Sequence, residues 1–169
     1  SQLGLKTAVI EKESLGGVCL NWGCIPTKAL LKSAQVFEYI NHAEDFGISV
    51  SNANADFSKV IKRSRDVADG MSKGIAYKKK KNKVEVIYGF GKLKQGGGVS
   101  VTNDGQTKEY TAKHIIIATG ARSRVLPNLP QDGKNIIGYR EAMTLKEMPK
   151  SMVIVGSGAI GAEFAYFYN

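Results

Sequence analysis

Two long stretches of the chain place apolar residues at the three-to-four spacing of an amphipathic helix. The first begins after Gly23, carries Pro26 in its first turn, where proline is tolerated, and predicts a helix that reaches Ile40. The second predicts a helix from Asp56, which suits the N-cap position, to Lys81. Its apolar face consists of Phe57, Val60, Ile61, Val67 and Met71.

Shorter apolar runs around these helices have the character of strands. Residues 7–11 predict a buried strand that ends at Glu11, and residues 83–111 predict short antiparallel strands with a hairpin turn at residues 103–106, Asn-Asp-Gly-Gln. The segment Gly89-Phe90-Gly91 indicates either a close backbone approach to a ligand or a bulge. Residues 113–120 contain three consecutive isoleucines, as expected of a strand buried on both faces of a parallel sheet. The pattern as a whole predicts an α/β fold.

A further predicted strand, residues 151–155, is followed at once by the pattern G-x-G-x-x-G and an apolar helix. Alone, this pattern is weak evidence, but between a strand and a helix it indicates dinucleotide binding. The first glycine makes the turn, the second admits the pyrophosphate, the third lets helix and strand pack, and the helix N-terminus holds the anion. The acidic residue that separates NAD from NADP would follow Asn169. The residues of the pattern are Gly156, Ser157, Gly158, Ala159, Ile160 and Gly161.

Composition and charge remove several classes of function. The 169 residues are 43% hydrophobic and 23% charged, as in ordinary globular chains. No apolar run approaches the roughly 18 residues of a membrane span. Much of the net charge of +9 comes from residues 78–83, which include five lysines. We interpret this run as a solvated helix end rather than a nucleic-acid site, because no aromatic residues alternate with the lysines.

Both cysteines of the chain lie five positions apart in one glycine-rich loop, which predicts redox chemistry. Five residues of regular helix rise about 7.5 Å, more than the roughly 6.8 Å between Cα atoms that a disulfide allows. A closed pair therefore needs a bend, which Asn21 and Gly23 permit. Cys24 is predicted at a helix N-terminus, where the dipole favours a thiolate, and Cys19 outside the helix, within reach of a partner thiol.

Two other interpretations of the cysteines are weaker. A structural zinc site wants four ligands, and only His42 and His114 could add to the pair, so we expect no metal. A purely structural disulfide would imply an oxidising compartment.

The order and spacing of three segments resemble the flavin-dependent pyridine nucleotide-disulfide oxidoreductases. These segments are the cysteine loop of residues 16–28, Gly-Gly-Val-Cys-Leu-Asn-Trp-Gly-Cys-Ile-Pro-Thr-Lys, the strand that ends at residues 118–120, and the glycine pattern through Glu163. The resemblance runs through nearly the whole chain. Leu20 and Ile25 are most similar to members that oxidise dihydrolipoamide, whereas glutathione and mercuric reductases typically have valine there. Trp22 departs from the pattern, because valine is usual at that position.

The resemblance implies a division of the chain. Residues 1–120 would form a Rossmann-like FAD-binding domain with a small antiparallel β-meander, and residues 121–150, with three of the four prolines, a connector. Residues 151–169 would be the first strand and helix of a second Rossmann-like domain that binds NAD. Both ends would be incomplete: the first FAD glycine motif would precede Ser1, and a catalytic His-Glu pair and a dimer interface would follow Asn169. The chain alone is then expected to be inactive.

The resemblance also implies roles for individual residues. In the complete enzyme, dihydrolipoyl thiols would reduce a Cys19–Cys24 disulfide, with Cys19 reacting with the substrate and Cys24 as the thiolate beside the flavin. Lys28 would pair with Glu163 between flavin and nicotinamide. The implied catalytic residues are Cys19, Cys24, Lys28 and Glu163. The implied FAD-binding residues are Glu11, Gly16, Gly17, Val18, Cys19, Lys28, Gly91, Thr119, Gly120 and Ala121, and the implied NAD-binding residues are the six of the glycine pattern and Glu163.

The implied partners are the lipoyl domains of 2-oxo acid dehydrogenase or glycine cleavage complexes, and a second copy in a homodimer, with neither nucleic acid nor membrane. The implied location is the bacterial cytoplasm or, in a eukaryote, the mitochondrial or plastid matrix. Two alternatives stay open: a glutathione- or mercuric-reductase-like enzyme that uses NADPH, and, for the isolated chain, an inactive nucleotide-binding module.

Overall fold

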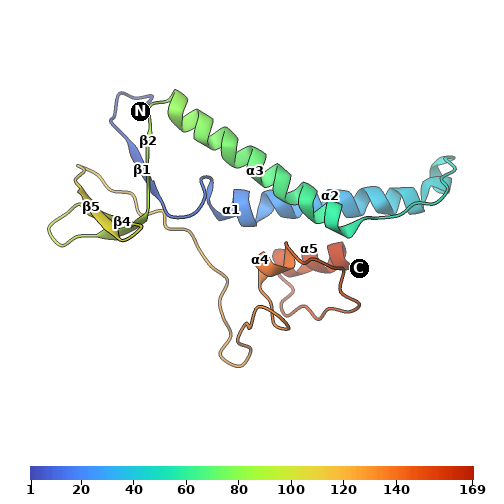
Figure 1. Cartoon of the computed structure of the whole chain (residues 1–169). Helices are drawn as coiled ribbons and strands as arrows, with labels where there is room; N and C mark the ends of the chain where they lie inside the picture. The colour runs from blue at the N-terminus through green and yellow to red at the C-terminus, as the bar shows by residue number, and fades with distance from the viewer. The chain divides into compact units, whose positions relative to one another are not determined.

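The structure, a computed structural model, describes residues 1–169. The fold is α/β and divides into two compact units. The first unit consists of Ser1–Gly17 and Gly70–Gly120, and the second of Val18–Asp69 and Ala121–Asn169. Figure 1 traces the chain and labels α1 to α5, β1, β2, β4 and β5. No helix combines the length and the apolar content that crossing a membrane requires.

The first unit holds two small sheets. Strand β1 (Ala8–Glu11) pairs in parallel with β2 (Glu85–Tyr88). Strands β3 (Phe90–Leu93), β4 (Val99–Asn103) and β5 (Gln106–Tyr110) form an antiparallel meander. The predicted hairpin turn is confirmed, because Asp104 and Gly105 both have positive φ, 47° and 77°, between β4 and β5. The sequence had not predicted β3 as a strand.

Tight packing around two glycines explains how β3 fits. A Cβ on Gly91 would lie 3.2 Å from Cγ2 of Ile10, so β3 approaches β1 closely at this point. Gly89, between β2 and β3, has a φ of 143°, and a Cβ there would lie 2.7 Å from the carbonyl oxygen of Thr102. The Gly89-Phe90-Gly91 segment therefore marks a close approach between segments of this chain.

The second unit is built from helices. Its elements are α1 (Gly17–Trp22), α2 (Cys24–Asn41), the short 3₁₀ helix η1 (Ala43–Phe46), the first half of α3 (Phe57–Lys81), α4 (Tyr139–Ala142) and α5 (Ala159–Tyr168). The core consists of one residue from each of α2, α3, α4 and α5 and the residue after α4: Leu30, Ile61, Ala142, Phe164 and Met143. This core brings the helix of Cys24 to the helix that follows the glycine pattern.

Local signals explain both long helices. Oδ1 of Asp56 accepts the main-chain N–H of Lys59 at 3.1 Å, which confirms Asp56 as the N-cap of α3. Ile61, Ser64 and Ala68 are buried at helical spacing along α3. Helix α2 begins at Cys24 with Pro26 in its first turn, as predicted.

Three expectations about strands were wrong. Strand β2, expected to be antiparallel within residues 83–111, pairs in parallel with β1. Residues 113–120 and 151–155 form no paired strand, and Ile116 and Val153 are 90% and 91% exposed. A strand exists only with a hydrogen-bonded neighbour, and no segment of residues 1–169 pairs with either run. Cys19 lies outside α2, as predicted, and belongs to the separate short helix α1. Within residues 121–150, expected as a connector, α4 and Met143 contribute to the core of the second unit.

Candidate active site

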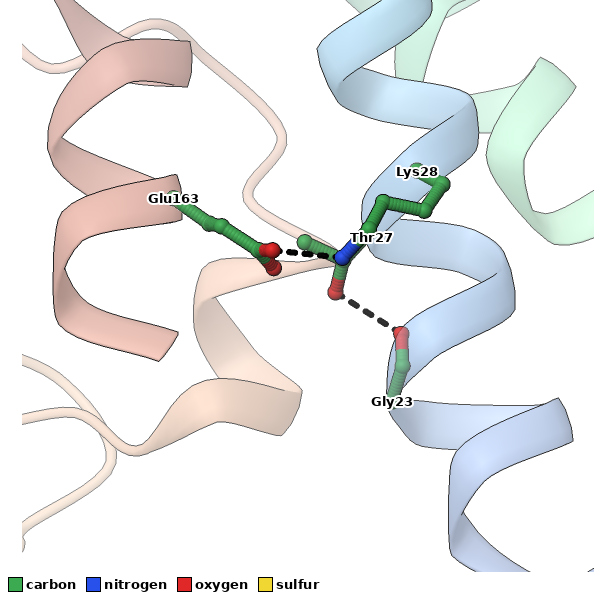
Figure 2. Close-up of polar contacts among 4 residues, drawn as sticks. All are labelled: Gly23, Thr27, Lys28 and Glu163. Atoms are coloured by element: carbon green, nitrogen blue, oxygen red, sulfur yellow. Dashed lines mark hydrogen bonds and ion pairs between the residues drawn. The ribbon is translucent and has the colours of Figure 1, made fainter. Parts of the chain in front are cut away.

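The two cysteines lie at the junction of α1 and α2. Cys19 is in α1, and Cys24 is the first residue of α2, as the sequence predicted for Cys24. Gly23 separates the two helices. Its carbonyl oxygen accepts both the main-chain N–H of Thr27, at 3.1 Å, and the Thr27 hydroxyl, at 2.8 Å, as Figure 2 shows for the hydroxyl. Because Thr27 is itself buried, these two bonds fix the start of α2.

Gly23 is required by the close approach of two backbone segments. A Cβ at this position would lie 2.9 Å from Cα of Cys19 and 3.0 Å from the carbonyl oxygen of Val18. Real Cβ atoms essentially never come closer than 3.0 Å to another heavy atom. The missing side chain of Gly23 thus allows the end of α1 and the start of α2 to pack closely, which places Cys19 beside Cys24.

The structure contains both cysteines as free, exposed thiols that interact with each other. The pKa of the Cys19 thiol is raised from its ordinary value, chiefly by a side-chain hydrogen bond with Cys24 and next by burial. The pair is therefore a dithiol whose two side chains interact directly, and this interaction favours the protonated form of Cys19.

Lys28 and Glu163 form an ion pair between α2 and α5. Nζ of Lys28 donates to Oε1 of Glu163 at 2.5 Å, and Figure 2 shows the two side chains meeting between their helices. The hydrogen bond with Glu163 is the largest cause that raises the pKa of Lys28, and the two cysteines add smaller Coulombic contributions. The structure therefore brings together Cys19, Cys24, Lys28 and Glu163, the four residues that the resemblance implied as catalytic, within the second unit.

The glycine pattern forms a tight turn before α5. Gly156 has a φ of 112°, which favours glycine. A Cβ on Gly161 would lie 2.1 Å from the carbonyl oxygen of Gly156, so the third glycine is needed for the turn to close. A Cβ on Gly158 would meet no protein atom within 4 Å. Ser157, Ala159 and Ile160 fill the turn and the first helical positions, with Ile160 63% exposed.

The remaining predicted residues lie in the first unit or at its boundary. Glu11 ends β1, and its Oε1 accepts the main-chain N–H of Glu13 at 2.8 Å. Gly16 and Gly17 have positive φ values of 108° and 70°, and a Cβ on Gly17 would meet nothing within 4 Å. Gly91 lies in β3 against Ile10. The other four residues, Val18, Thr119, Gly120 and Ala121, are exposed.

Sequence reasoning missed two arginines beside the cysteine loop. The guanidinium carbons of Arg65, in α3, and Arg140, in α4, lie 4.2 and 4.9 Å from the centroid of the Trp22 ring. No local pattern could have found them, since the three residues are far apart in sequence. The only signal was Trp22 itself, in the place of the usual valine.

Comparison with known proteins assigns the chain to a family. The family described as pyridine nucleotide-disulphide oxidoreductase matches residues 1–169. The chain belongs to this family. A dihydrolipoyl dehydrogenase of Chlorobaculum tepidum is 55% identical over 169 residues, 99% of this chain and 36% of the relative. A dihydrolipoyl dehydrogenase of Rhizobium etli is 47% identical over all of this chain and 38% of its own length.

Two solved protein structures have the same fold as this chain. LpdA from Mycobacterium tuberculosis matches 96% of this chain and 36% of its own, with a TM-score of 0.88 and 28% identity. The HOCl-induced flavoprotein disulfide reductase RclA from Escherichia coli matches 99% of this chain and 35% of its own, with a TM-score of 0.80 and 28% identity. The expected Rossmann-like α/β class is confirmed. The chain spans little more than a third of the length of the proteins that it matches.

Proposed function

We propose that the protein containing this chain is a dihydrolipoyl dehydrogenase, which oxidises protein-bound dihydrolipoamide to lipoamide with NAD⁺. The observation that carries the proposal is the Cys19 and Cys24 dithiol at the start of α2, one helical turn from the Lys28–Glu163 ion pair. The name of the relatives that are 47% and 55% identical supports this substrate. Their bacterial origin supports a cytoplasmic enzyme.

The chemistry of the cysteine pair follows from thiol–disulfide exchange. A dihydrolipoyl thiolate attacks the Cys19 sulfur of a Cys19–Cys24 disulfide, which forms a mixed disulfide and releases Cys24 as a thiolate. The second dihydrolipoyl thiol then attacks the lipoyl sulfur of the mixed disulfide. This step closes the lipoyl ring and releases Cys19, which takes up the proton of the attacking thiol. Two electrons have passed from substrate to protein, and the product state is a dithiol like the one in the structure.

Features of the chain favour these different roles for Cys19, which reacts with the substrate, and Cys24, which is released as a thiolate. The first-turn N–H groups of α2 and the helix dipole stabilise negative charge at Cys24. The hydrogen bond with Cys24 raises the pKa of Cys19, which favours the protonated thiol at Cys19 after its release. Lys28 adds positive charge on the same side of the pair, since its Coulombic effect lowers the pKa of Cys19 and the cysteines raise that of Lys28.

The residues present fit FAD and NAD. In the turn before α5, Gly158 has no protein atom where a Cβ would lie, and the free N–H groups at the start of a ten-residue helix suit a pyrophosphate. NAD would be held by Gly156, Ser157, Gly158, Ala159, Ile160 and Gly161, with Glu163 beside them. The open, positive-φ backbone of Gly17 fits a similar approach by FAD.

FAD would be held in the first unit by Glu11 on a ribose hydroxyl pair, and by the backbone of Gly16, Gly17, Gly91, Thr119 and Gly120. In the second unit, Val18, Cys19, Lys28 and Ala121 would contribute. When bound, FAD would accept the electron pair of the dithiol and pass it on as hydride to NAD⁺. Lys28 and Glu163 would keep a fixed charge pair beside this reaction, and the proton released from the dithiol would leave through exposed groups.

The partners follow from the proposed substrate. Lipoyl domains of 2-oxo acid dehydrogenase or glycine cleavage complexes would present the dihydrolipoyl arm, and a second copy of the full-length protein would complete a homodimer. The domain division into residues 1–120, 121–150 and 151–169 stays part of this proposal.

The test is an assay of the full-length protein with dihydrolipoamide and NAD⁺, in which NADH formation is measured. We expect Cys19→Ser and Cys24→Ser each to abolish it. Cys24→Ser should leave a Cys19 that still forms a mixed disulfide with lipoamide, detected by intact mass, whereas Cys19→Ser should not. NADH formation that survives both substitutions would refute the proposal. Turnover only with NADPH and glutathione disulfide or mercuric ion would instead establish the reductase alternative.

A further inference from the structure

Trp22 stands between the two cysteines in sequence, and its ring contacts arginines of α3 and α4. It is the last residue of α1, directly before Gly23. The guanidinium carbon of Arg65 lies 4.2 Å from its ring centroid and that of Arg140 lies 4.9 Å away. Both distances are within the roughly 6 Å over which a cation is attracted to an aromatic ring. One half-buried indole thus joins the end of α1 to α3 and α4.

Arg65 holds the end of α1 at a second point. Its Nη2 donates to the carbonyl oxygen of Asn21 at 2.5 Å, and Asn21 is only 6% exposed. Its Nη1 is buried without a hydrogen-bond partner. The orientation of this guanidinium is therefore set by the two consecutive residues of α1 that it contacts, Asn21 through its carbonyl and Trp22 through its ring.

The helices that carry the two arginines contribute to the buried core of the second unit. Ile61 of α3 and Ala142 of α4 lie in one buried core together with Leu30 of α2. Helix α2 begins with Cys24, and α1 carries Cys19. Cys24 is attached to the core through α2. The contacts of Trp22 attach α1, and with it Cys19, to the same core.

We propose that Trp22, held by Arg65 and Arg140, is a positioning residue that keeps Cys19 in place to form a disulfide with Cys24. This inference rests on the proposed redox function of the pair. A six-residue helix is too short to be stable alone, so without the ring the dithiol has more conformational freedom. Closing a freer dithiol costs more entropy, which makes the disulfide less stable and the pair easier to reduce. Arg65 and Arg140 act through the ring in this role.

The experiment compares Trp22→Val with Trp22→Phe in the full-length protein. Each variant is equilibrated with glutathione and glutathione disulfide, acid-quenched, alkylated and analysed by mass to count the free thiols of Cys19 and Cys24. In the reaction, the two protein thiols lose two electrons and two protons to one glutathione disulfide, which becomes two glutathione molecules. We expect Trp22→Val to lower the equilibrium constant for disulfide formation about tenfold, equivalent to ~30 mV for this two-electron couple. Trp22→Phe, which keeps a ring for the cations, should retain most of the parent value.

Arg140→Gln is the second variant, because it leaves Trp22 and the core intact and removes one cation. It should shift the equilibrium in the same direction by a smaller factor. An unchanged equilibrium constant in both Trp22→Val and Arg140→Gln, or an equal shift in Trp22→Phe and Trp22→Val, would overturn the positioning role. A parent protein that forms no Cys19–Cys24 disulfide at any glutathione ratio would instead overturn the proposed function on which the inference rests.

Discussion

Gly23→Ala tests the central geometric claim, that the absence of a side chain at one position brings the cysteines together. The added Cβ would lie 2.9 Å from Cα of Cys19 and 3.0 Å from the oxygen of Val18. Carbon atoms in contact prefer about 3.5–4.0 Å, so the two segments must separate by roughly 0.5–1 Å. Both obstacles are backbone atoms, and no side-chain rotation can relieve them. We therefore expect α1 to move away from the start of α2 and carry Cys19 with it.

The cost should appear in chemistry more than in stability. Overpacking of this kind costs about 1–3 kcal/mol of folding free energy, whereas a misplacement of about 1 Å in a reacting group can cost on the order of 10²-fold in rate. We expect the NAD⁺-linked oxidation of dihydrolipoamide to fall about 10²-fold in kcat. The Cys19–Cys24 disulfide should also form more slowly after oxidant is added, as measured by alkylation and mass.

Gly70→Ala is the matched control, because it makes the same substitution within α3 at a place where a Cβ would meet nothing within 4 Å. An alanine in a helix interior is favoured over glycine by about 0.5–1 kcal/mol, so this variant should be slightly more stable and keep its kcat. If Gly23→Ala retained kcat and the rate of disulfide formation within about twofold of Gly70→Ala, the reasoning about the junction would be refuted, since misplacement is expected to cost far more.

Three further predictions concern the glycine turn, the ion pair and the cap of α3. Gly161→Ala puts a Cβ 2.1 Å from a main-chain oxygen and should lower both thermal stability and NAD affinity. Gly158→Ala puts a Cβ where it meets no protein atom and should lower NAD affinity alone. Thermal melts measure the first effect and binding calorimetry the second. Glu163→Gln removes the main cause of the raised Lys28 pKa. The stabilisation that this raised pKa gives the fold is complete below the ordinary value of 10.5 and is lost as the pH rises through the raised value. Parent and variant should therefore converge in stability as the pH rises into the alkaline range. The Asp56 pKa is lowered to about 2, chiefly by the hydrogen bond from the Ser58 hydroxyl and next by the main-chain N–H of Lys59. The stabilisation from Asp56 should therefore be complete above pH 3.8 and disappear as the pH falls toward 2, whereas Asp56→Asn, which can cap without titrating, should show no such loss in acid unfolding.

Much of the local structure could be predicted from the sequence because its causes are local. Asp56 and the apolar spacing after it determine where α3 begins, and Pro26 marks the first turn of α2. The Asn-Asp-Gly-Gln turn predicts the β4–β5 hairpin because few other residues adopt positive φ so readily. The cysteine loop and the glycine pattern identified the family, since their chemistry requires particular residues at fixed spacing.

The tertiary structure decided what depends on partners distant in sequence. The isoleucine run of residues 113–120 has strand propensity, but pairing needs a neighbour, and no segment of residues 1–169 provides one. The sequence also did not predict that Cys19 lies in a helix, because a helix as short as α1 depends on tertiary contacts. The arginines on Trp22 belong to helices brought together only by the burial of Ile61 and Ala142 in one core. The sequence by itself therefore determined the reactive groups and their helices, and packing determined which charges and rings surround them.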